Sequence, residues 1–134
     1  MLNKLENNIL ISILLLAMFF VSGITKIATF NETVASIQKR FTIITHEKLH
    51  QMITILVVLL EIIAPILIIN YFINKTAKDY AYYSTLALAI FTIIATFIYH
   101  YPDFSSYKRS IAFWANISLL GGLLLLAKHI RSEL

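Results

Sequence analysis

The chain has 134 residues, of which 59% are apolar, and it carries a formal net charge of +4 and no cysteine. This apolar fraction is too high for a soluble domain of that length, and glycine-poor runs of Ile, Leu, Phe and Ala disfavour a β-barrel, so we expect an all-α integral membrane domain over residues 1–134. The absence of cysteine excludes disulfides and thiolate metal sites, and the scattered basic residues argue against a nucleic-acid partner.

Four apolar segments are long enough to cross a hydrocarbon layer about 30 Å thick. They cover approximately residues 9–28, 49–72, 80–101 and 111–127. The connections after the second and third spans are short, so successive helices should be antiparallel neighbours. The sequence therefore predicts an up-down four-helix bundle with both termini on the same side of the membrane. Lys and Arg are divided almost evenly between the two ends of the bundle, so they do not predict the orientation of the protein in the membrane. The identity of the membrane is also left open.

The link between the first and second spans has the pattern of a short amphipathic helix over approximately residues 31–45. Val34, Ile37, Phe41 and Ile44 recur at spacings of three or four, with charged and amide side chains between them. This periodicity is typical of a helix that lies in the membrane interface with one apolar side.

Glu61 lies near the middle of the second span, where an unpaired carboxylate costs about 3 kcal/mol or more. Pro65 follows four residues later and lacks the amide hydrogen that would bond the Glu61 carbonyl, so we expect an opened and kinked backbone there. The acid and the freed carbonyl could bind a proton, a cation or the polar head of a quinone or lipid. The alternative is a protonated or salt-bridged group with a structural role.

The other three spans contribute polar residues to the same half of the bundle as Glu61. Counted at about 1.5 Å per residue, Lys26, His100, Thr96 and Asn116 could line a polar funnel that binds a ligand or relays protons. Each also has a structural interpretation: Lys26 as a snorkelling anchor, His100 as a helix cap, Asn116 as an interhelical hydrogen bond and Thr96 as a hydroxyl bonded to its own helix. No metal site and no specific catalytic residue are predicted.

Small residues should allow close helix packing. We expect this role for Gly23 on the first span and for Ser118, Gly121 and Gly122 on the fourth.

Four stretches together resemble a known family of small membrane proteins. They are FFVSGITKI (19–27), LLEIIAPILII (59–69), IIATFIYH (93–100) and NISLLGGLLLLA (116–127). In this order they resemble DoxX-like proteins, which include DoxD/DoxX-type components associated with thiosulfate:quinone oxidoreductase. The resemblance implies a four-helix membrane bundle. Its recognisable positions match Gly23, Lys26, Glu61, His100 and the Gly121–Gly122 pair, whereas the Ala64–Pro65 pair departs from the small glycines common in the family.

The resemblance also implies an accessory or quinone-interacting component of a membrane redox system. Without cysteines or haem-ligand pairs, we expect the chain to hold no intrinsic cofactor and at most to bind a quinone or dock a soluble or membrane oxidoreductase. The first alternative is a non-enzymatic scaffold that binds a partner or a second copy of itself. A less favoured alternative is a small transporter or lipid-binding protein.

Overall fold

The computed structural model describes residues 3–100 and 105–132, and within these ranges every regular element is a helix. The helices are α1 (Lys4–Ala28), α2 (Phe30–Arg40), α3 (Glu47–Asn74), α4 (Lys78–Tyr99) and α5 (Tyr107–Ser132). Four of them, all except α2, are long and apolar enough to cross a membrane. The predicted all-α membrane fold is therefore confirmed.

The spanning helices extend beyond most of the segments expected from apolar residues alone. At the start of α1, the Asn3 side chain accepts a hydrogen bond from the Glu6 amide at 2.8 Å, and the Glu6 carboxylate accepts one from the Asn3 amide at 2.9 Å. This reciprocal capping satisfies amide groups that have no helical partner, so polar residues can form the first turn. Tyr101, the expected end of the third span, lies outside the described residues.

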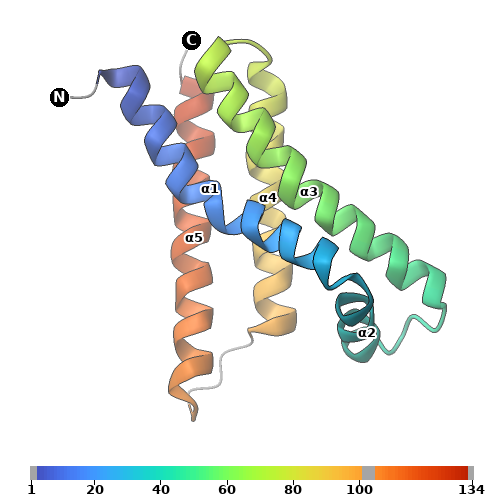
Figure 1. Ribbon diagram of the computed structural model, residues 1–134. Coiled ribbons are helices and arrows are strands. Elements are labelled where there is room, and N and C mark those ends of the chain that lie inside the picture. Colours follow the sequence, from blue (N-terminus) through green and yellow to red (C-terminus); the bar gives the residue numbers. More distant parts are fainter. Residues whose placement is uncertain (1–2, 101–104, 133–134) are drawn as a thin grey trace.

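The bundle consists of two helix pairs that are inclined to each other. α1 packs mainly on α3, α4 packs on α5, and the contact of α3 with α4 joins the two pairs. Figure 1 shows the pairs meeting at the end where α1 begins and α5 finishes, and diverging toward the end that carries α2. The shared apolar core includes large, fully buried side chains at Leu16, Ile68, Phe72, Leu88 and Leu123.

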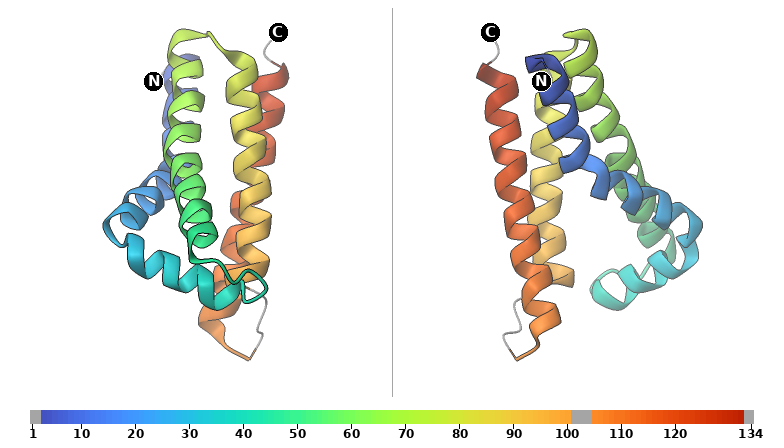
Figure 2. Two further views of the ribbon diagram at one scale, coloured as in Figure 1. Left: turned by 90° about the vertical axis from the view of Figure 1, so that its right-hand side faces the viewer. Right: turned by 60° about the vertical axis from the view of Figure 1, so that its left-hand side comes forward.

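α2 lies across the spans at the diverging end of the bundle (Figure 2). Its apolar residues Val34 and Ile37 are buried, and the helix contacts both α3 and α1. α2 ends at Arg40, so Phe41 and Ile44 of the expected amphipathic segment lie beyond the helix. The apolar side of α2 is therefore covered by other helices of the protein. This packing explains why so short a helix is stable here.

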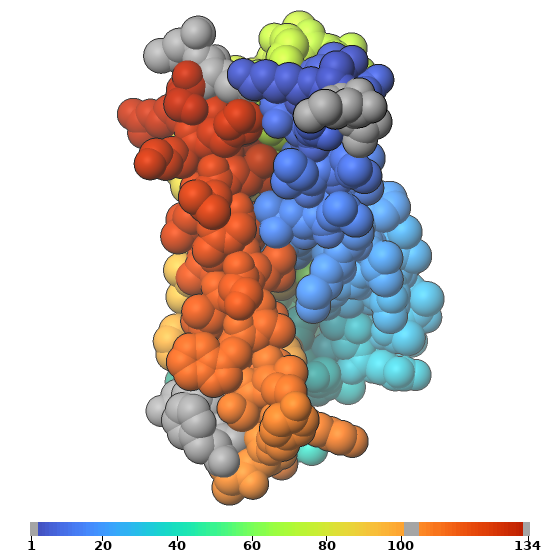
Figure 3. Space-filling view, turned by 90° about the vertical axis from the view of Figure 1, so that its left-hand side faces the viewer, coloured from blue at the N-terminus to red at the C-terminus, as the bar shows by residue number. Residues whose placement is uncertain are grey.

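Two glycines lie at close helix contacts. A Cβ atom at Gly23 would be 2.8 Å from Ile62 Cγ1 and 3.2 Å from Glu61 Cβ, and one at Gly122 would be 2.8 Å from Leu15 Cδ1. Figure 3 shows α1 against α5 over the upper part of one face, with the two helices separating farther down.

The other two small residues on α5 lie outside these contacts. Gly121 and Ser118 are exposed, and an added Cβ at Gly121 would meet nothing within 4 Å. These two positions lie on the outer side of α5, so the close packing expected of them does not involve the described part of this chain.

These contacts predict opposite effects of the same substitution at two glycines. Gly23→Ala should destabilise the fold by about 1–3 kcal/mol, because the new methyl group overlaps α3 atoms close to its backbone. Gly121→Ala should be neutral or stabilise by up to about 1 kcal/mol through helix propensity. Thermal unfolding of both variants in one detergent measures the difference, and equal stabilities would contradict the close α1–α3 contact.

Candidate functional site

The central feature of the site is an ion pair between α1 and α3. Lys26 Nζ lies 2.8 Å from Glu61 Oε2 and 3.0 Å from Glu61 Oε1, and donates to both. The Glu61 side chain is 3% exposed and that of Lys26 is 25% exposed. Lys26 therefore points inward to the acid, although its stem is long enough for the snorkelling anchor considered from the sequence.

Ser22 completes a three-residue cluster with this pair. Its hydroxyl donates to Glu61 Oε1 at 3.1 Å, and Lys26 Nζ also donates to Ser22 Oγ. Ser22 and Lys26 are four residues apart and so share one side of α1. An ammonium group has three N–H donors, and the three contacts of Lys26 account for all of them. We call these residues the Ser22–Lys26–Glu61 cluster.

The local sequence explains how the cluster forms. Gly23 follows Ser22 and lets α1 approach α3 to within contact of the Glu61 stem. Pro65 is buried one turn beyond Glu61, yet α3 continues without interruption from Glu47 to Asn74. Proline removes the usual helical donor to the Glu61 carbonyl. It is nevertheless the Glu61 side chain, and not this carbonyl, that takes part in the cluster.

The remaining predicted polar residues lie outside the cluster. His100 is exposed at the end of α4, and its backbone amide donates to the Thr96 carbonyl; its side chain bonds to no described residue. Thr96 is buried, but its hydroxyl donates to the Thr92 carbonyl of its own helix at 2.6 Å. Asn116 is half-buried and makes no hydrogen bond with the described residues. Counting residues along each span predicts how deep these groups lie in the membrane, but not the direction in which each side chain points.

Sequence reasoning missed two polar residues. Ser22 could have been found from its spacing of four to Lys26. The other is His50, which is 2% exposed; its Nε2 lies 3.4 Å from the Phe41 carbonyl, and no described residue bonds its Nδ1. A buried imidazole is easily overlooked because the periodicity of α3 is dominated by aliphatic residues.

His50 closes the run HEKLH (46–50), which has the H-E-x-x-H spacing of helical zinc sites. That site requires both histidines on one side of a helix. Here α3 begins at Glu47, so His46 precedes the helix and is exposed, whereas His50 is buried. Among the described residues, no group of three His, Cys, Asp or Glu side chains could hold a metal ion. The spacing therefore does not produce a metal site in this arrangement.

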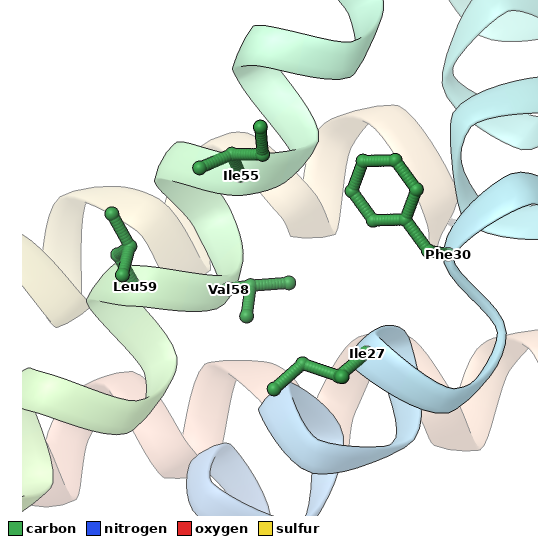
Figure 4. Close-up of a pocket in the computed structure, with 5 residues that line it drawn as sticks. All are labelled: Ile27, Phe30, Ile55, Val58 and Leu59. Atoms are coloured by element: carbon green, nitrogen blue, oxygen red, sulfur yellow. The ribbon is translucent and has the colours of Figure 1, made fainter.

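An apolar hollow of about 230 Å³ lies between α1 and α3, near the beginning of α2. Figure 4 shows its lining residues, Ile27, Phe30, Ile55, Val58 and Leu59. Ile27 follows Lys26 in the sequence and Val58 precedes Glu61 by about one turn, so the hollow lies within about one helical turn of the cluster. Its lining suits a hydrocarbon chain and offers no polar side chain.

Fold and site together define a small, helical, multi-span membrane protein with an internal ion pair. A family model described as "Methylamine utilisation protein MauE" matches residues 8–106, and the chain belongs to this family. No curated protein matches the chain significantly, and neither does any solved structure.

The difference in exposure between the two charges predicts unequal effects of removing them. Lys26→Met should cost about 3–5 kcal/mol, because it leaves the Glu61 carboxylate buried without a partner. Glu61→Gln should cost less, because the freed ammonium can extend toward the headgroups. Thermal unfolding measures both, with Lys4→Met at the exposed start of α1 as the control. A greater loss for Glu61→Gln would contradict this account.

Proposed function

We propose that this chain is an accessory membrane component of a redox system that serves methylamine utilisation. Membership of the MauE family supports the link to methylamine. The single observation that carries the accessory role is the closed cluster: all three Lys26 donors are directed at Ser22 and Glu61. No donor on Lys26 remains for a substrate, and the two opposite charges neutralise each other.

In this proposal the cluster has a structural task. Separating the two charges of a buried ion pair would leave each without a partner away from water, at a high cost in free energy, so the pair resists separation. It fixes α1 on α3 and so gives the chain a defined shape to present to an oxidoreductase partner. The exposed small residues Ser118 and Gly121 on α5 offer a surface to which a partner's helix, or a second copy of this chain, could pack closely.

A quinone-interacting role is a second candidate, and the apolar hollow favours it. The hollow could take an isoprenoid chain while a hydroxyl of the quinol head donates to Glu61, whose oxygens can accept further hydrogen bonds. The resemblance of the four sequence stretches to DoxX-like proteins also supports this role. The quinone would be a bound ligand of a partner system and not an intrinsic cofactor.

We also propose that both termini lie on the same side of the membrane. The start of α1 and the end of α5 lie at the same end of the bundle, which supports this topology (Figure 1). Accessibility of terminal tags in intact and permeabilised cells would test it.

The accessory role predicts a specific defect in the source cell. Deleting the chain should abolish or strongly reduce oxygen uptake driven by methylamine and leave uptake driven by a non-amine substrate unchanged. Expression of the wild-type chain should restore it. Unchanged methylamine-driven respiration after deletion would refute the accessory role.

The quinone-interacting role predicts that filling the hollow prevents binding. A lipophilic quinol should raise the unfolding temperature of the purified wild-type protein, and Ile55→Phe should remove that increase because residue 55 lines the hollow. Leu56→Phe is the matched control, since Leu56 is exposed and does not line it. No stabilisation of the wild type, or equal stabilisation of both variants, would exclude the hollow as a quinol site.

A further inference from the structure

The connection from α2 to α3, residues 41–46, carries an unusually exposed aliphatic residue. The Ile43 side chain is 96% exposed, and its neighbours Thr42 and Thr45 are exposed as well. An isoleucine side chain gains about 1.5–3 kcal/mol when it leaves water for an apolar environment. In a chain whose spanning helices end at this level, the nearest such environment is the bilayer.

Three cations bracket this residue. Lys39 and Arg40 form the last turn of α2, and Lys48 lies in the first turn of α3; all three are exposed. Two carboxylates, Glu32 and Glu47, also lie on these helices. None of the three cations forms an ion pair with a carboxylate within the described part of the chain. The charge of this segment is therefore available to an external anion.

Arg40 is held in place by the protein. Its Nη1 donates to the Ile98 carbonyl at 2.9 Å, and its guanidinium carbon lies 4.9 Å from the centre of the Tyr99 ring. These contacts fasten the end of α2 to the end of α4. A guanidinium group has five N–H donors, so an oriented cation remains available beside Ile43.

We propose that Lys39, Arg40, Ile43 and Lys48 bind anionic phospholipids. The lysines and the arginine would contact the phosphates, and Ile43 would insert between the headgroups. α2 lies across the spans, as a helix parallel to the membrane plane does (Figure 2). Val34 and Ile37 are buried on its apolar side, whereas Lys39 and Arg40 are exposed. An exposed aliphatic side chain among cations at the level of the span ends is the pattern of an interfacial segment.

The cations at the opposite end of the bundle are arranged differently. Arg131 Nη1 donates to the Tyr82 hydroxyl at 3.2 Å, and Lys78 Nζ donates to the Arg131 carbonyl at 3.1 Å. Lys75 lies 5.2 Å from the centre of the Tyr71 ring. These contacts connect cations to neighbouring helices and rings. The two ends carry similar numbers of basic residues, but among the described residues it is the α2 end that combines its cations with a fully exposed aliphatic side chain.

A fluorescent probe at position 43 tests the insertion. Trp114 is the only tryptophan in the chain, so Ile43→Trp is introduced together with Trp114→Phe. In bilayer nanodiscs that contain phosphatidylglycerol, we expect blue-shifted emission that lipids brominated near the headgroup quench and that aqueous iodide does not. Water-like emission quenched by iodide would overturn the proposal.

A charge comparison tests the lipid preference. Phosphatidylglycerol is titrated into the full chain in a neutral detergent. The test variant carries both Lys39→Gln and Lys48→Gln, and the control variant carries both Lys4→Gln and Lys128→Gln at the other end of the bundle. Affinity should fall by roughly fivefold for each lysine removed near α2, more strongly at low salt, because a basic residue near an anionic surface contributes about 1 kcal/mol. The control should bind like the wild type.

Three results of this titration would contradict the proposal. They are equal losses in both double variants, equal binding of phosphatidylcholine, and competition by millimolar glycerol phosphate, which would indicate a site for free phosphate. Binding of an acidic soluble protein in place of the lipid would likewise assign this surface to a protein partner. All four lysines are exposed, so the substitutions leave the packed core unchanged.

Discussion

The arrangement of this bundle depends on the requirement that a carboxylate within a membrane span must have a partner. Glu61 is buried at the middle of α3, and Lys26 from α1 supplies the opposite charge at 2.8 Å. The other local features follow from that contact. Gly23 removes the side chain that would keep α1 and α3 apart, and Ser22 occupies the remaining donor of the ammonium group. A costly charge thereby becomes a specific contact between two helices.

This constraint acts on one helix pair only, and the shape of the molecule reflects it. α1 and α3 are joined by a buried polar cluster. α4 and α5 are joined mainly by apolar packing, with hydrogen bonds of Arg131 at one end, and meet the first pair in the core around Ile68 and Leu123. At the end where the pairs diverge, α2 lies across the spans and Arg40 connects it to the end of α4. The hollow and the exposed Ile43 both belong to this less tightly packed end. Side chains at this end therefore have room to meet a ligand or lipids.

Much of the fold could be predicted from the sequence, because span length and apolar content follow from the thickness of the bilayer. The need of Glu61 for a partner was also readable. That its partner is Lys26, and not His100, Thr96 or Asn116, could not be predicted, because the depth of a residue along a helix does not give the side of the helix on which it lies. For the same reason the sequence did not show that Ser118 and Gly121 lie on the outer side of α5. α2 was predicted from its periodicity, but not that Val34 and Ile37 would be buried against protein. Resemblance pointed to DoxX-like proteins, whereas the family established for this chain is MauE.

The central claim is that Lys26 and Glu61 stabilise the fold as a pair. A double-mutant cycle measures this directly: the unfolding free energies of the wild type, Lys26→Met, Glu61→Gln and the double variant are compared in one detergent. The account predicts that the double variant is more stable than the sum of the single effects implies, with a coupling free energy of about 1–3 kcal/mol. Additive effects within about 0.5 kcal/mol would show that the two side chains do not depend on each other and would contradict the account.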